Sequence, residues 1–125
     1  MPSIQQNESL PLEYTLALVS GKWKLLILYF LLTQRVMRYG ELKRSVTGIT
    51  HKMLSMQLKE LELDGLIQRK EYRQIPPRVD YSLTPLGNTL QPMIAQMYDW
   101  GKENMTRDAL GFETTAEEAR AFTLF

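Results

Sequence analysis

The stretch from Gly48 to Gly87 constrains the fold of this chain more than any other part of the sequence. Thr50 has the side chain of a helix N-cap, and Gly65 stands where a helix that begins there would end. Two short segments of strand composition follow, Leu66–Tyr72 and Val79–Leu83, and the second alternates apolar and polar residues with period two. The stretch therefore predicts a helix, a tight stop and a β-hairpin.

Pro76 and Pro77 indicate where the hairpin turns, because a proline inside a paired strand would remove a hydrogen bond from the ladder. A basic helix followed by a hairpin is the order of parts in a winged helix-turn-helix. In that fold the helix enters a DNA groove and the hairpin, called the wing, lies beside it. We therefore predict a mainly α fold with a small β-hairpin (α+β), and a DNA-binding function.

The helix predicted over residues 50–64 has an apolar side and a polar side. Leu54, Leu58 and Leu61 fall within about 60° of one another at 100° per residue, so they form its buried side. The opposite side carries lysines, a serine hydroxyl and a methionine thioether. Lysines suit phosphates or guanine edges, a hydroxyl suits hydrogen-bond donors or acceptors on a base edge, and a thioether suits a thymine methyl group. The alternative is a plain solvated helix face. Leu63 also falls outward, and we expect it to pack under the hairpin. The helix residues predicted to contact DNA are Thr50, His51, Lys52, Ser55, Met56 and Lys59.

Other cations flank this helix in the sequence. Arg73 and Arg78 are the basic residues closest to the hairpin tip, and long cations on a stiff tip suit the DNA backbone or the minor groove. Arg38 and Lys43 belong to the segment before the turn, where we predict phosphate contacts. The alternative is that a basic hairpin only keeps the edge of a sheet soluble.

The charge is unevenly distributed along the chain although the formal net charge is only +1. Residues 20–80 contain 12 Lys and Arg against 6 Asp and Glu, whereas the rest contains 3 basic and 8 acidic residues. A basic middle with acidic ends favours a domain whose centre faces a polyanion. A randomly uneven surface is the alternative.

The composition argues against several other classes of protein. The chain has no cysteine and one histidine, and it contains neither a G-x-S-x-G motif nor a glycine-rich phosphate loop. We therefore expect no enzymatic activity, no cofactor and no metal site. The longest apolar run, Leu25–Leu32, is far shorter than the roughly 20 residues of a membrane span, and no signal peptide is visible. We expect a cytoplasmic protein with no membrane partner.

The other segments complete a single domain over residues 10–104. The segment 22–32 is apolar on most of its surface, which predicts the central helix of a small bundle. Thr84 and Pro85 predict the start of a long helix that continues to about Glu103. Residues 1–9 are expected to form a flexible arm and residues 105–125 a tail, in which a capping-box spacing at 115–118 predicts a short helix. Further elements are predicted over residues 12–19 (helix), 37–39 (strand) and 40–46 (helix).

Five segments, in this order, resemble the HxlR-type winged-helix transcriptional regulators of bacteria. They are G-K-W-K-L-L-I-L at 21–28, R-Y-G-E-L-K-R at 38–44, G-I-T-H-K-M-L at 48–54, L-K-E-L-E-L-D-G-L-I at 58–67 and Y-S-L-T-P-L-G at 81–87. The resemblance covers Leu10 to Asn104, over three quarters of the chain.

The resemblance implies a homodimer that binds a pseudo-palindromic operator in double-stranded DNA, with repression as the family's commoner behaviour. It places the groove-reading positions at 50–59 and the wing at 73–78. It also implies that N- and C-terminal helices form the dimer interface, with plain intramolecular core as the alternative for Trp100. The residues assigned to that interface are Leu12, Leu16, Met93, Met97 and Trp100.

The chain departs from the family pattern at Leu10. Thiol-sensing members carry a cysteine there in a C-P-x-E pattern, and this chain has Leu10-Pro11-Leu12-Glu13. A leucine cannot form a thiolate, so an effector, if there is one, binds noncovalently. An unidentified small molecule between the dimer helices is therefore a candidate partner. The rival function is a winged helix that serves as a protein-protein interaction module, and salt-dependent DNA affinity would separate the two.

Overall fold

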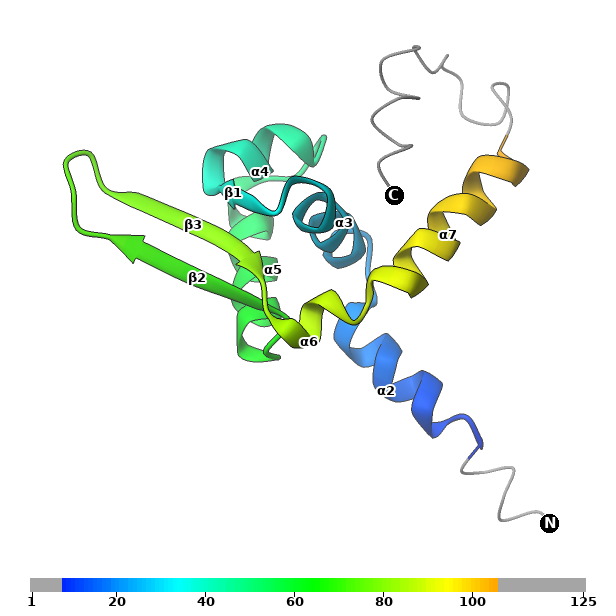
Figure 1. The fold of residues 1–125 in the computed structure, drawn as a ribbon. Coiled ribbons are helices and arrows are strands. Elements are labelled where there is room, and N and C mark those ends of the chain that lie inside the picture. Colours follow the sequence, from blue (N-terminus) through cyan, green and yellow to red (C-terminus); the bar gives the residue numbers. More distant parts are fainter. Residues whose placement is uncertain (1–7, 106–125) are drawn as a thin grey trace. The chain divides into compact units, whose positions relative to one another are not determined.

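A computed structural model describes residues 8–105 (Figure 1). The chain divides into two compact units, and the boundary between them in the sequence lies between Asn88 and Thr89. The first unit holds helices α2 (Leu10–Val19), α3 (Lys24–Gln34), α4 (Tyr39–Ser45), α5 (His51–Leu63) and α6 (Pro85–Asn88), and strands β1 (Val36–Arg38), β2 (Ile67–Tyr72) and β3 (Arg78–Leu83). The second unit holds α7 (Gln91–Asn104). The predicted fold class, mainly helical with a small sheet, is confirmed.

The three strands form one antiparallel sheet in the order β1-β3-β2. Gln68 pairs with Ser82 across the hairpin, and Met37 of β1 pairs with Tyr81 on the other side of β3. Figure 1 shows the β2–β3 hairpin extending away from the helices to its tip, where Pro76 and Pro77 lie between the strands as predicted. The sequence predicted the short first strand but not its pairing with β3, which makes β3 the central strand.

The hydrophobic core of the first unit is centred on α3, which contacts α4, α5 and the sheet. The predicted inner side of α5 is confirmed, because the side chains of Leu54, Leu58 and Leu61 are buried. Tyr81 and Leu83 of β3 complete the core from the sheet. The helix that carries the predicted DNA contacts is thus fixed along its whole length by apolar packing. The other fully buried apolar side chains include Ile27, Leu28, Leu31, Leu42, Val46, Ile49, Leu66 and Ile67.

The predicted long helix from Pro85 to about Glu103 is wrong, because the structure has two helices there, α6 and α7. The break lies just before Pro92, in the first turn of α7. A proline at that position has no N–H to donate to the carbonyl of Asn88 four residues earlier, and its ring would clash with that carbonyl. Proline in the first turn of a new helix costs nothing, so the chain stops α6 and starts again. Thr84 does cap α6, since its Oγ1 accepts from the Gly87 N–H at 3.0 Å.

One further expectation is contradicted by the structure, and one falls on residues that it does not describe. Leu63 does not pack under the hairpin: it lies in the last turn of α5 and its side chain is 77% exposed. The expected arm over residues 1–9 and tail over residues 105–125, with its short helix, lie almost entirely outside the described residues.

Within residues 8–105, no single helix is long and apolar enough to cross a membrane, and α2 and α3 pass that test only as a pair that is bent by 76°.

Candidate DNA-binding surface

Helix α5 begins at a well-formed cap. Thr50 has extended backbone angles, and its Oγ1 accepts a hydrogen bond from the Met53 N–H at 3.1 Å. Because the inner side of α5 is buried against the core, its outer side faces away from the protein. All six predicted contact residues are exposed, and four of them, Lys52, Ser55, Met56 and Lys59, follow one another along this outer side. We call α5 the recognition helix from here on.

The start of the recognition helix is held by a residue that the sequence did not single out. The hydroxyl of Tyr39, the first residue of α4, lies 3.1 Å from His51 Nδ1, 3.1 Å from the His51 carbonyl oxygen and 3.3 Å from Ser55 Oγ. The phenol and imidazole rings are stacked, with centroids 5.8 Å apart and planes 10° apart. Two predicted contact residues therefore share one partner on the preceding helix.

The two predicted phosphate contacts before the turn differ in exposure. Arg38 is exposed and immediately precedes α4, where its backbone N–H donates to Glu41 Oε1 at 3.0 Å. Lys43 lies within α4 and is half-buried. Arg38 is therefore the more accessible of the two.

The two predicted wing cations lie in different electrostatic surroundings. Arg73 is exposed at the tip, outside both strands. Arg78 donates two hydrogen bonds of 3.0 Å, from Nε and Nη2, to the two carboxylate oxygens of Asp80, and its guanidinium lies 5.0 Å from the ring centre of Tyr72. These bonds hold the pKa of Asp80 below its usual range. The structure thus leaves Arg73 open to an anion, whereas the charged guanidinium of Arg78 is already paired with the carboxylate of Asp80.

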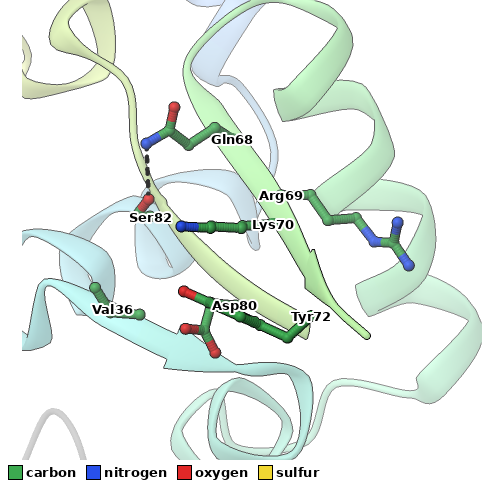
Figure 2. A pocket seen from close by; sticks show the side chains of 7 residues that line it. All are labelled: Val36, Gln68, Arg69, Lys70, Tyr72, Asp80 and Ser82. Carbon is green, nitrogen blue, oxygen red and sulfur yellow. Dashed lines mark hydrogen bonds between the residues drawn. The ribbon is translucent and has the colours of Figure 1, made fainter. Parts of the chain in front are cut away.

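The outer face of the sheet carries a shallow polar hollow of about 370 Å³ (Figure 2). Gln68 and Lys70 extend over this face, and Arg69 points to the opposite side of β2, as the alternation of a strand requires. Gln68 Nε2 donates to Ser82 Oγ at 3.1 Å, and Asp80 is held by Arg78. Three polar side chains of this hollow, those of Gln68, Ser82 and Asp80, are therefore already hydrogen-bonded within the protein.

A second hollow of about 260 Å³ lies between the recognition helix and β2. Ser55 and Lys59 line it from the helix, and Arg69 lines it from the strand. Arg69 forms an ion pair with Glu71, and this pairing raises the pKa of the Arg69 guanidinium. Nothing in the sequence distinguishes Arg69 from the other hairpin cations, since the position of Arg69 beside Lys59 depends on how β2 pairs and packs.

The apolar residues predicted to form a dimer interface are poorly covered within residues 8–105. On α2, Leu12 is 63% exposed and Leu16 is 49% exposed. On α7, Met97 is 51% exposed, Trp100 is 69% exposed and Met93 is half-buried. Helices with this much exposed apolar surface are typical of interfaces with a partner.

A model of the HxlR-like helix-turn-helix family matches residues 18–109, a span that includes the whole helix-turn-helix and the wing. The chain belongs to this family.

Two individual relatives and one solved structure agree with that assignment. The chain is 54% identical over 101 residues to YdzF, an HTH-type transcriptional regulator of Bacillus subtilis, covering 81% of this chain and 93% of YdzF. It is 48% identical over 101 residues to an HTH-type transcriptional regulator of Halalkalibacterium halodurans, covering 81% of this chain and 89% of the relative. The structure of the redox regulator HypR in its oxidized form superposes with a TM-score of 0.73 at 44% identity, covering 77% of this chain and 98% of HypR.

The HxlR-type chain described here is accordingly a DNA-binding transcriptional regulator with a winged helix-turn-helix. The helix-turn-helix is formed by α4 and α5, and the wing by β2 and β3. HypR is named as a redox regulator. The present sequence contains no cysteine, so it has no thiol with which to carry out cysteine redox chemistry.

Proposed function

We propose that this regulator binds a pseudo-palindromic operator as a homodimer, with the recognition helix in the major groove and the wing on the backbone or minor groove. The observation that carries the proposal is the division of α5 into a buried leucine side and an exposed side with Lys52, Ser55 and Lys59. An α-helix fits the major groove of B-DNA, and phosphates attract cations that have no partner in the protein. Repression and a cytoplasmic location are part of the proposal, as is the lack of an enzymatic activity.

The ion pairs of residues 8–105 support this placement. Lys24, Arg69 and Arg78 each pair with an acidic residue. Lys52, Lys59 and Arg73 form no ion pair within this range, and they lie on the recognition helix and at the wing tip. Other cations of this range, such as Lys22 and Arg38, form no ion pair either, but Lys52, Lys59 and Arg73 are the ones that lie at the two places that the winged helix-turn-helix offers to DNA.

The homodimer is supported by the exposed apolar side chains of α2 and α7. Two copies joined by these helices would present two recognition helices, and an operator with two related half-sites would match that symmetry. An effector stays a prediction: the pairing of polar groups in the hollow of Figure 2 gives no support for placing one there.

Selection of genomic DNA fragments, followed by a gel-shift titration of the best fragment at low and moderate salt, tests the proposal. The wild type should bind a short inverted repeat tightly and with strong salt dependence. Lys52→Ala/Lys59→Ala should weaken binding. It should also make the negative slope of log K against log salt shallower by about 2, because two phosphate contacts are lost. Lys22→Ala, which removes a lysine from the turn before α3, should leave the slope unchanged.

Weak binding that ignores sequence, and that the double variant does not change, would contradict the proposal. In that case the exposed face of α5 would instead suit a protein partner.

A further inference from the structure

The hydroxyl of Tyr39 contacts three polar atoms of the recognition helix. They are His51 Nδ1 and the His51 carbonyl oxygen, each at 3.1 Å, and Ser55 Oγ at 3.3 Å. Tyr39 is half-buried, whereas His51 and Ser55 are exposed on the predicted DNA-binding side. One tyrosine therefore lies directly behind two residues that we expect to face the operator.

The number of protons in this cluster permits a single arrangement in which all three contacts are hydrogen bonds. A phenol hydroxyl donates once and accepts through its lone pairs. A carbonyl oxygen can only accept, so the Tyr39 proton must point to the His51 carbonyl. The other two contacts are then hydrogen bonds only if Tyr39 Oη accepts from both His51 Nδ1–H and the Ser55 hydroxyl. His51 carries its proton on Nδ1 in this arrangement, and the Ser55 proton points inward.

We propose that Tyr39 is a specificity-determining residue, because its hydroxyl leaves Ser55 with only lone pairs to offer to a base. A free serine hydroxyl either donates or accepts and so reads either kind of base edge. A serine that already donates its hydroxyl proton to another group can only accept a hydrogen bond from a base. It favours the amino groups of adenine N6 and cytosine N4 over the keto oxygens of guanine and thymine. This inference rests on the proposed docking of α5 in the major groove.

The hydrogen-bond arrangement has a test that does not involve DNA. His51 is the only histidine in the sequence, so nitrogen-15 NMR of its ring has no overlap from other histidines. At a pH where the imidazole is neutral, Nδ1 of the wild type should show the chemical shift of a protonated nitrogen. Tyr39→Phe keeps the stacked ring but removes the hydroxyl, so the proton should redistribute towards Nε2. Tyr14→Phe removes the same atom from an exposed position on α2 and should change nothing.

An unprotonated Nδ1 in the wild type would overturn the proposal, and so would a tautomer that Tyr39→Phe leaves unchanged. The wild-type measurement needs no variant, so it decides the arrangement even if Tyr39→Phe folds poorly.

The readout itself is tested by titrating the protein with operators that carry every single base-pair substitution. At one position the wild type should prefer an amino-bearing base by on the order of fivefold to tenfold, the value of one neutral hydrogen bond. Tyr39→Phe and Ser55→Ala should each lower that ratio to about twofold or less, and the double variant should lower it no further. Overall affinity for the best operator should change much less than this ratio.

If Ser55→Ala loses the preference and Tyr39→Phe keeps it, or if Ser55→Ala changes no preference, Tyr39 does not determine specificity. A wild type without any sequence preference would instead refute the docking of α5 and, with it, the readout. The NMR measurement then still reports separately on the hydrogen bonds of Tyr39.

Discussion

Gly87 shows how closely the chain approaches itself at the end of the wing. A Cβ built on this residue would lie 2.1 Å from the carbonyl oxygen of Leu66, 3.1 Å from its carbonyl carbon and 3.2 Å from Leu83 Cδ2. The first two atoms belong to backbone that is fixed where α5 ends and β2 begins. A glycine is therefore required here by space and not by backbone angles.

We expect Gly87→Ala to destabilise the protein by about 1–3 kcal/mol or more, because the backbone of Leu66 would have to move. The matched control is Gly101→Ala in α7, where nothing described lies within 4 Å of an added Cβ. That change should be neutral or stabilise the helix by up to about 1 kcal/mol. Thermal unfolding of both variants at one protein concentration measures the difference, and a harmless Gly87→Ala would contradict the close packing.

Lys24 and Glu60 form an ion pair between α3 and the recognition helix, with Nζ 2.8 Å from Oε2. The two partners differ in burial, since the side chain of Lys24 is 11% exposed and that of Glu60 is 45% exposed. Removing the carboxylate leaves a buried ammonium without its partner. Removing the ammonium leaves a carboxylate that water can still reach.

Glu60→Ala should therefore cost about 1–3 kcal/mol of unfolding free energy, and Lys24→Met should cost less than that. Urea unfolding at a fixed protein concentration compares them. Glu62→Ala, which changes an exposed glutamate with no ion pair among the described residues, should stay within about 0.5 kcal/mol of the wild type. A larger loss from Lys24→Met than from Glu60→Ala would show that the pair is not asymmetric in this way.

The residue-level network around Tyr39 could not be predicted from the sequence. Tyr39 is 12 residues from His51 and 16 from Ser55, so neither helix periodicity nor strand alternation connects them. Their contact depends on the angle at which α4 and α5 meet. The identities of the exposed residues on α5, in contrast, followed from the 100° spacing of its three leucines.

At the scale of elements, capping and turn residues were sufficient to predict where an element begins or ends. Thr50, Gly65 and the Pro76-Pro77 pair predicted the limits of α5 and the tip of the wing, and the structure places all of them there. The long helix after Pro85 failed because its apolar stripe continues across Pro92, and the proline outweighs the stripe. The central place of β3 also escaped prediction, since three residues in β1 are too few for a strand pattern.

The wing contains a carboxylate whose charge depends on its neighbour. Arg78 lowers the pKa of Asp80, so the charged form of Asp80 is favoured in the folded protein. Its contribution to stability is present above the unfolded-state pKa of about 3.9 and is lost as the pH falls through the lower folded-state value.

We therefore expect the urea midpoint of the wild type to fall as the pH drops below about 4, because Asp80 of the unfolded chain gains a proton there while Asp80 of the folded protein still resists protonation. Asp80→Asn should be less stable than the wild type at pH 7 and should show a smaller decrease in acid. Asp64→Asn, an exposed residue at the end of α5, should keep the wild-type profile. Midpoints measured between pH 7 and pH 2.5 would contradict this if Asp80→Asn and the wild type decreased in parallel.

At the scale of the whole molecule, the proposed dimer depends on α2. Leu12 and Leu16 are four residues apart, so they lie on the same face of the helix, and both are largely exposed. Leu12→Glu/Leu16→Glu should convert a dimer into monomers, because a second copy would have to bury two charges. Light scattering coupled to size-exclusion chromatography measures the mass.

The same variant should bind an inverted repeat no better than a single half-site, since the two recognition helices are no longer joined. Gln34→Glu, an exposed change at the end of α3, should leave both the mass and the affinity unchanged. A variant that remains dimeric would move the interface away from this face of α2.

Thr84 joins the two parts of the proposed DNA-binding surface at one point. Its hydroxyl lies 2.5 Å from the carbonyl oxygen of Gly65 and 3.2 Å from that of Leu66, so the residue that follows β3 is bonded to the turn that follows α5. The base of the wing and the end of the recognition helix are therefore anchored to the same short segment of backbone. In the proposed docking the protein would act as a caliper of fixed opening: we expect that an operator half-site with one base pair added between the positions contacted by the helix and by the wing can satisfy one of them, but not both.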